Sequence, residues 1–176
     1  MIRTKICLTA MLLLVCSALF AQENLSEHLA PLKPFIGKTW VGTFNNSSDG
    51  KQTIDVSRWE RALNGQAVRI LHSINNGEYG GESILYWDKE KKSLVYYYFT
   101  TAGFMTHGTM SFNGNKIISR ETVSGNKNGI TEVKSVGEVL PDGTMRSTSQ
   151  YLQNGKWVEG HSATYKESPD AKVIFK

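Results

Sequence analysis

The stretch NGQAVRILHSINNG, residues 64–77, decides the fold class of this chain. It has an Asn-Gly pair at each end, and Asn and Gly readily adopt the positive φ angles that tight hairpin turns require. Between the turns, Val68, Ile70, His72 and Ile74 fall on one face when alternate residues are read together. This is the period of a half-buried β-strand. The stretch therefore predicts one strand that turns back on itself at both ends.

The same turn chemistry recurs about every 12 to 15 residues after Lys38. The turn signals are Ser48–Gly50, Asn64-Gly65, Asn76-Gly77, Asp88–Lys92, Ala102-Gly103, Asn113-Gly114, Asn126–Gly129, Pro141–Gly143 and Asn154-Gly155. These nine turns separate ten segments rich in Val, Ile, Thr, Tyr, Phe and Trp, the residues favoured in strands. Closing such a meander into a barrel removes both exposed edges. We therefore expect an all-β protein, an antiparallel up-and-down (meander) β-barrel of about ten strands with a short N-terminal helix.

The short helix is expected within residues 22–38. Leucines recur there at helical spacing, at Leu25, Leu29 and Leu32. Ser26 fits an N-cap, while Pro31 and Pro34 limit the helix to a turn or two. We expect this segment to pack as a lid on one end of the barrel.

Residues 1–21 have the pattern of a secretory signal peptide. Arg3 and Lys5 give a positive start, an apolar run covers residues 6–20, and Ala21 is a small residue suited to cleavage. The apolar run is shorter than the roughly 20 residues that span a bilayer. We expect a mature domain of residues 22–176, beginning at Gln22, that is secreted or periplasmic.

Cys16 leaves a lipid anchor open as an alternative. A lipoprotein signal has a small residue before its cysteine, and Val15 is not small, so cleavage after Ala21 is preferred. The two cysteines of the chain, Cys7 and Cys16, both lie in this leader. The mature domain would then have no disulfide, no cysteine nucleophile and no cysteine metal site.

The mature domain is only mildly basic. The leader holds two of the 20 Lys and Arg and none of the 16 Asp and Glu, which leaves a net charge of +2. Lys89, Lys91 and Lys92 form the one basic cluster, but Glu90 interrupts it and it falls on a predicted turn, where a solvated loop explains it. We expect no nucleic-acid partner and no membrane span, and we leave the oligomeric state open.

The segment FIGKTWVGTF, residues 35–44, resembles the opening of calycin-type barrels. These include lipocalins, fatty-acid-binding proteins, nitrobindin-like heme proteins and secreted bacterial lipocalin-like domains of uncharacterised function. Gly37 and Trp40 match their glycine and tryptophan, with one residue more between them than the lipocalin Gly-x-Trp has. Trp40 and Gly42 also follow the Trp-x-Gly order of nitrobindin-like chains. The resemblance implies that Trp40 packs at the closed end of the barrel and that the interior holds a hydrophobic ligand.

Arg58 and Glu60 alternate with Ile54 and Val56 in the second predicted strand. If that face points inward, Arg58 would anchor the acidic head of a ligand, because a buried charge needs a partner or a use. If the strand bulges instead, both charges reach solvent at the barrel mouth. Both alternatives are open from the sequence alone.

Three histidines fall in predicted strands. His72 is expected to point inward with Val68, Ile70 and Ile74. His107 shares a face with Met105 and Thr109, and His161 shares one with Trp157, Ala163 and Tyr165. His161 is the best positional match to the heme-binding relatives, so the resemblance allows heme through His161. A hydrogen-bonded histidine is the simpler interpretation, and we expect no cofactor and no metal.

Aromatic residues at 96–99 alternate, so either Tyr96 and Tyr98 or Tyr97 and Phe99 must face inward. Rings with a polar tip suit the wall of an amphipathic cavity, and they equally suit an ordinary β core. We assign Tyr98 to the expected site.

The preferred function is an exported small-molecule binding protein that holds an apolar or amphipathic ligand in the barrel cavity. Its expected lining residues are Arg58, Glu60, His72, Tyr98, His107 and His161. One alternative is a packed barrel acting as an envelope or protein-interaction module, and another is an enzyme using the same cavity, although no motif supports a particular reaction. Two convergent titratable groups in the cavity would favour the enzyme. If the interior is close-packed, or if Arg58 points outward, the interaction module becomes the preferred function in place of a carrier of an apolar or amphipathic ligand.

Overall fold

The computed structural model describes residues 24–44, 52–125 and 128–176. The expected signal peptide, including Cys16, and the expected turn at Ser48–Gly50 lie outside these residues, as do positions 126 and 127 of a later turn. Within the described ranges, no helix combines the length and hydropathy needed to cross a membrane.

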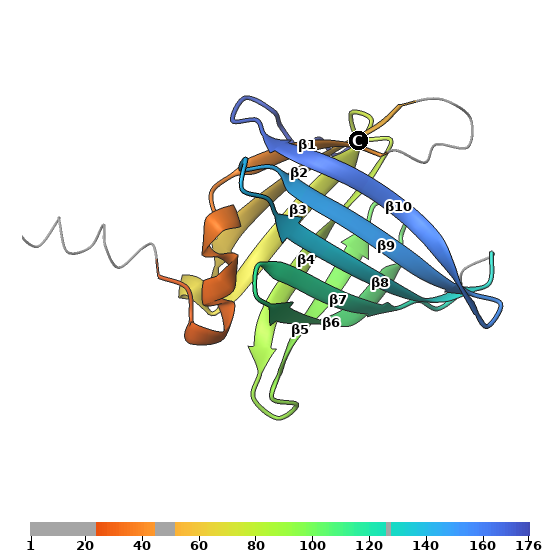
Figure 1. The fold of residues 1–176 in the computed structure, drawn as a ribbon, viewed down its shortest axis with the longest axis horizontal. Coiled ribbons are helices and arrows are strands. Elements are labelled where there is room, and N and C mark those ends of the chain that lie inside the picture. The colour runs from red at the N-terminus through yellow and green to blue at the C-terminus, as the bar shows by residue number, and fades with distance from the viewer. Residues whose placement is uncertain (1–23, 45–51, 126–127) are drawn as a thin grey trace, which may run out of the picture.

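Ten antiparallel strands form a closed barrel in which each strand pairs with its neighbours in the sequence, and β1 pairs with β10 to close it (Figure 1). The strands are β1 (Thr39–Phe44), β2 (Thr53–Ala62), β3 (Ala67–Ile74), β4 (Tyr79–Asp88), β5 (Ser93–Thr100), β6 (Met105–Asn113), β7 (Lys116–Thr122), β8 (Ile130–Val139), β9 (Met145–Gln153) and β10 (Lys156–Glu167). The predicted meander barrel of ten strands is confirmed.

The described turns fall where Asn and Gly predicted them. Asn76 and Gly77 join β3 to β4 with φ angles of 59° and 91°, in the region that a tight hairpin turn requires. The turn between β2 and β3 contains a short 3-10 segment, η2 (Leu63–Gly65), where Asn64 has a φ of 53°. Local turn chemistry therefore sets the length of these strands.

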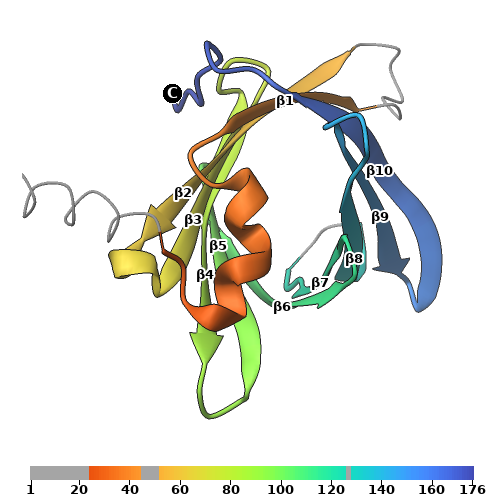
Figure 2. The same ribbon diagram turned by 60° about the vertical axis from the view of Figure 1, so that its left-hand side comes forward.

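A 3-10 helix, η1 (Glu27–Phe35), covers one end of the barrel (Figure 2). Its buried residues, Leu29, Leu32 and Phe35, are three apart, and a 3-10 helix aligns residues at that spacing on one side. The helix contains both Pro31 and Pro34 and runs for nine residues. The expectation of one or two turns was therefore too short, because this three-residue period accommodates both prolines within it.

The start of η1 also differs from the expectation. The side chain of Ser26 makes no capping hydrogen bond. Instead its backbone N–H donates to the carbonyl oxygen of Gly65 at 2.8 Å, which ties the lid to the turn between β2 and β3. The lid is thus held by this backbone hydrogen bond to the barrel rim as well as by the packing of its three buried residues.

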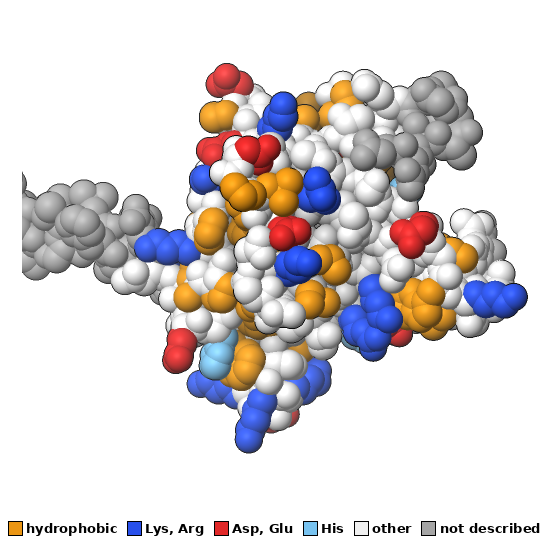
Figure 3. Space-filling model, in the orientation of Figure 1, with side chains coloured by type: hydrophobic (Ala, Val, Ile, Leu, Met, Phe, Trp, Pro, Cys, Tyr) orange, Lys and Arg blue, Asp and Glu red, His pale blue; other side chains and the backbone are white. Residues whose placement is uncertain are grey.

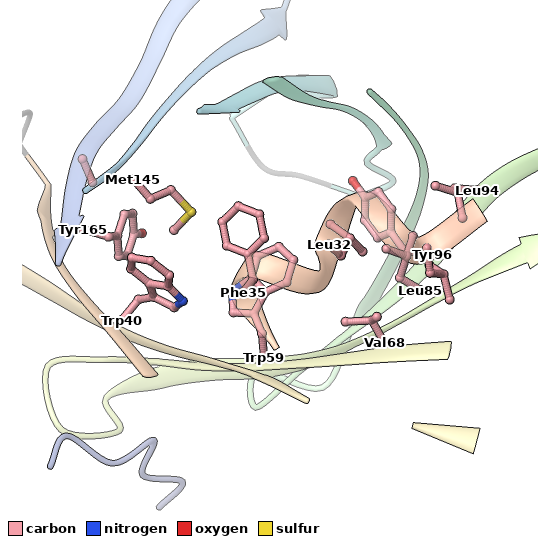
Figure 4. Packing of buried hydrophobic residues seen from close by; sticks show 12 residues of the cluster. Leu32, Phe35, Trp40, Trp59, Val68, Leu85, Leu94, Tyr96, Met145 and Tyr165 are labelled. Carbon is pink, nitrogen blue, oxygen red and sulfur yellow. The ribbon is translucent and has the colours of Figure 1, made fainter. Parts of the chain in front are cut away.

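The hydrophobic core lies directly beneath this lid (Figure 4). Phe35 stacks on Trp59 with ring centroids 4.9 Å apart and meets Trp40 at 5.9 Å. Trp40 is only 2% exposed and belongs to the same cluster as Met145 and Tyr165. The apolar core therefore closes the lid end of the barrel.

Candidate functional site

The register of the strands determines which side chains face the interior. On β2, Asp55, Ser57 and Trp59 are buried, and Ser57 lies opposite His72 on β3. Alternate residues point to opposite faces of a strand. The inward face of β2 is therefore that of the odd-numbered residues, and Arg58 and Glu60 lie on the outer face.

The expectation that Arg58 and Glu60 could line the interior was wrong. Arg58 Nε donates to Glu60 Oε1 at 2.8 Å, and Arg69 on β3 makes two 2.8 Å hydrogen bonds to Glu82 on β4. Glu60 and Arg69 approach to 3.6 Å and link these pairs into a network on the outer wall. The face drawn in Figure 3 also carries basic, acidic and apolar side chains side by side.

His107 also lies on the outer face and not in the interior. It is paired with Tyr97 across β5 and β6, and the two rings stack at 6.1 Å. Both line an outer groove of about 370 Å³ together with Lys91, Arg120 and other residues. Because Tyr97 faces out, Tyr96 and Tyr98 are the inward pair of this strand.

His72 and Tyr98 meet inside the barrel, as part of a chain of hydrogen-bonded groups. Asp55 Oδ1 lies 2.9 Å from His72 Nδ1, and His72 Nε2 lies 2.6 Å from the hydroxyl of Tyr98. The Tyr98 hydroxyl donates to the hydroxyl of Tyr79 at 3.0 Å. The four groups come from β2, β3, β5 and β4, which are consecutive neighbours in the sheet.

Tyr165 completes the environment of Asp55, because its hydroxyl donates to Asp55 Oδ2 at 2.8 Å. The ring of Tyr165 lies flat over Gly42 on β1, where a β-carbon would come within 2.6 Å of the ring. Gly81 on β4 gives the ring of Tyr98 the same close approach. These glycines let the two tyrosines lie flat along the wall.

Burial dominates the electrostatics of these tyrosines. The pKa of Tyr98 is raised by burial, by its hydrogen bond to Tyr79 and by the charges of Glu121 and Asp55. The pKa of Tyr165 is raised by burial and by Asp55. Both side chains are therefore neutral hydrogen-bonding groups at physiological pH.

Glu121 on β7 is a second inward carboxyl, and it contributes to the charge around Tyr98. Its Oε2 accepts a long hydrogen bond of 3.5 Å from the hydroxyl of Tyr96. Burial raises the pKa of Glu121. Three titratable side chains, Asp55, His72 and Glu121, thus converge on one interior space.

His161 reaches the same space because of a β-bulge in β10. Between Glu159 and Ser162 the register against β9 shifts by one residue. The bulge turns His161 to the face of Ala163 but leaves Trp157 outside, where Lys134 lies 3.8 Å from the centre of its ring. The expectation that Trp157 and His161 share a face was therefore wrong.

The imidazole of His161 lies between two rings, 5.0 Å from that of Phe44 and 5.8 Å from that of Tyr151. Among the described residues that line this part of the interior there is no Lys or Arg to pair with the acidic groups of a heme. Heme has no part in the function proposed below, and His161 as an iron ligand stays a prediction. No cluster of three or more potential metal ligands occurs in the described ranges.

Two adjoining chambers occupy the interior. The lid-end chamber, of about 240 Å³, has a largely apolar wall that includes Trp59, Ile70, Met110, Ile117 and Met145. The polar chamber, of about 370 Å³, is lined by residues that include Asp55, His72, Tyr98, Glu121, Tyr151 and His161. Both chambers are lined by Ser135, Ser147 and Tyr165. The interior is therefore hollow, and its polarity increases away from the lid.

Comparison with known proteins bears on the fold. Among solved structures, Rv2717c from M. tuberculosis shares the barrel. Its crystal structure superposes with a TM-score of 0.59, covering 82% of this chain and 99% of that chain at 12% sequence identity. At this identity the likeness concerns the fold alone. No family model and no curated protein matches the chain, so the calycin-type assignment of residues 35–44 stays a resemblance.

Sequence reasoning missed Asp55, Glu121 and Tyr79. Asp55 stands between Ile54 and Val56, so the apolar face of this strand looked like the inner one. Glu121 follows Arg120 and resembles an ordinary surface charge. The available signal was Trp59, a large aromatic on the same face as Asp55, since large aromatics are usually buried.

Proposed function

We propose that this protein binds one small amphipathic molecule inside the barrel, with the apolar part under the lid and the polar head in the polar chamber. The observation that supports this most directly is the pair of adjoining chambers, one apolar and one polar. Their volumes fall in the range of about 300–1,000 Å³ typical of ligand sites when taken together. A closed barrel also gives such a ligand walls on every side.

The outward position of Arg58 changes the kind of ligand. A fatty acid carrier needs a cation for the carboxylate, and Arg58 was the residue expected to supply it. Arg58 pairs with Glu60 on the outer wall. It therefore does not supply a cation inside the barrel for the carboxylate of a fatty acid. The outward Arg58 meets one of the two conditions set above for preferring the interaction module. The other condition, a close-packed interior, is not met, because the interior holds two chambers, so we keep a binding function with a different ligand.

The test uses two variants that add the same ring on opposite faces of β8. A β-carbon at Gly137 would meet only Ile117, at 3.9 Å, so Gly137→Phe projects a ring into the lid-end chamber without displacing backbone. Val136→Phe adds its ring to the outer face. The probe is the uncharged methyl ester of dansyl-aminohexanoic acid, whose fluorescence rises in an apolar site.

We expect micromolar binding of this ester by the unmodified protein and by Val136→Phe, and a loss of at least about tenfold in affinity for Gly137→Phe because the ring occupies the chamber. Circular dichroism checks that both variants are folded. Equal affinities for the two variants would place the probe outside the barrel and contradict the proposal.

An acid–base enzyme in the same cavity is the second candidate. The hydrogen-bonded chain from Asp55 through His72 to Tyr98 favours it, since a carboxylate that orients an imidazole is a common acid–base arrangement. Native mass spectrometry of protein purified from its own host would identify the bound molecule. Conversion of that molecule by the unmodified protein but not by folded His72→Gln would establish catalysis, and an unchanged ligand mass would leave a binding protein.

A further inference from the structure

The acidic side chains of the polar chamber are groups that attract cations. Two carboxyl groups, Asp55 and Glu121, line it. Among the described residues that form its wall there is no Lys and no Arg. The basic side chains of the chamber are two histidines, His72 beside Asp55 and His161 between the rings of Phe44 and Tyr151, and a histidine does not carry the permanent charge of a Lys or an Arg.

Aromatic rings form much of the remaining wall. Phe44, Tyr98, Tyr151 and Tyr165 come from four different strands and line the same chamber. The face of an aromatic ring attracts a cation through its quadrupole, and this attraction is stronger where water is excluded. Rings combined with carboxylates are the chemistry that recognises ammonium groups.

The carboxylates also have capacity for another partner. Each oxygen of Asp55 accepts one hydrogen bond, from His72 or from Tyr165, and a carboxylate oxygen can accept two. Glu121 has a long contact of 3.5 Å to Tyr96, and burial makes its charged form unfavourable, which outweighs the opposing effect of hydrogen bonds from Thr106 and Tyr96. A bound cation would offset that cost.

We propose that the head group of the ligand is an organic ammonium ion, held in the polar chamber by Asp55 and Glu121 and by the surrounding aromatic rings. This inference rests on the proposed function, because it names the chemical class of the molecule bound there. An acidic head is disfavoured, since it would meet two carboxyl groups without a neighbouring guanidinium or lysine ammonium.

The test compares three probes that share one fluorophore and one alkyl chain and differ in the head group. Dansylcadaverine carries an ammonium, dansyl-aminohexanoic acid carries a carboxylate, and the methyl ester of that acid is neutral. Fluorescence titration at neutral pH gives the dissociation constant of each. We expect dansylcadaverine to bind at least about tenfold more tightly than the carboxylate, with the ester between them.

Glu121→Gln keeps the shape of the side chain and removes its charge, so it should lower the preference for the ammonium probe at least about threefold while changing the affinity for the ester little. Glu138→Gln, which removes a carboxylate from the outer face of the barrel, should leave the preference unchanged. Asp55→Asn adds to the test if circular dichroism shows that it folds. If it unfolds, Glu121→Gln decides the outcome.

The two proposals fail in different ways. Tight binding of the ester with no preference for the ammonium, or with preference for the carboxylate, would overturn the ammonium inference and leave the proposed function intact. A preference for ammonium that is the same in Glu121→Gln as in the unmodified protein would also overturn it. Failure of all three probes to bind would overturn both.

Discussion

Glu121 links the ionisation of a single side chain to the stability of the barrel. Burial raises the pKa of its carboxyl above the ordinary value of 4.5, so the folded protein holds this proton more tightly than the unfolded chain does. The resulting stabilisation is fully present below the unfolded pKa and is lost as the pH rises through the folded pKa. We therefore expect Glu121→Gln to gain stability relative to the unmodified protein as the pH rises above the ordinary carboxyl pKa of 4.5.

Urea unfolding of both proteins at each pH measures this difference. The titratable groups around Glu121 are present in both proteins: Tyr96, and the chamber residues Asp55, His72, Tyr98, Tyr151, His161 and Tyr165. Glu138→Gln on the outer wall is the control, and we expect little change with pH there. If the difference in free energy of unfolding between Glu121→Gln and the unmodified protein stays constant with pH, Glu121 is not desolvated.

Asp55 and Arg58 show why the site was only partly predictable. This strand faces a hollow, polar interior on one side and carries paired charges on the other. The alternation of apolar and polar residues along it therefore does not identify the inner face. Ile54 is 41% exposed, whereas Asp55 is 5% exposed. His72 was placed inside correctly because Val68, Ile70 and Ile74 on its own face are apolar, whereas residues 96–99 are aromatic on both faces and left the inward pair of that strand open.

The bulge in β10 is the element that brings His161 to the cavity. A β-carbon at Gly160 would meet the hydroxyl of Ser149 and would lie 2.8 Å from Cζ of Tyr151. Bulges bend a strand and redirect the side chains that follow. The sequence alone did not reveal this extra residue, which reverses the alternation within a single strand.

We expect Gly160→Ala to destabilise the protein by about 1–3 kcal/mol, because its methyl group overpacks against Ser149 and Tyr151. Gly137→Ala is the matched control. A β-carbon at that position has only an ordinary contact, so stability should be unchanged or slightly higher. Chemical denaturation measures both variants, and equal stabilities would mean that the bulge tolerates a side chain.

Turns and strands were the most predictable elements, because their signals are local. Asn and Gly at the turns set the strand lengths, and their near-even spacing predicted a meander. The lid was predicted less well: its location and buried leucines were expected, but its length and the lack of a serine cap depend on contacts with Phe35, Trp59 and the backbone of Gly65. Such long-range contacts are not visible in a local pattern.

For the molecule as a whole, closure of the barrel is what creates the site. Asp55, His72, Tyr98 and Glu121 lie on four strands, and the pairing of β1 with β10 completes the wall around them. The lid and its aromatic core fill one end, and the chambers occupy the space beyond. The meander barrel therefore supplies both the apolar lid-end chamber and the polar chamber for one ligand.

Methyl NMR of the protein with dansylcadaverine tests most directly whether a ligand occupies this interior. The inward methyl groups of Ile70, Met110, Ile117 and Met145 line the lid-end chamber, whereas Ile118 and Val136 face an outer groove. We predict chemical-shift changes and intermolecular nuclear Overhauser effects at the inward methyl groups, with Ile118 and Val136 unaffected. Contacts confined to the outer methyl groups, or to the groove beside Tyr97 and His107, would contradict the account.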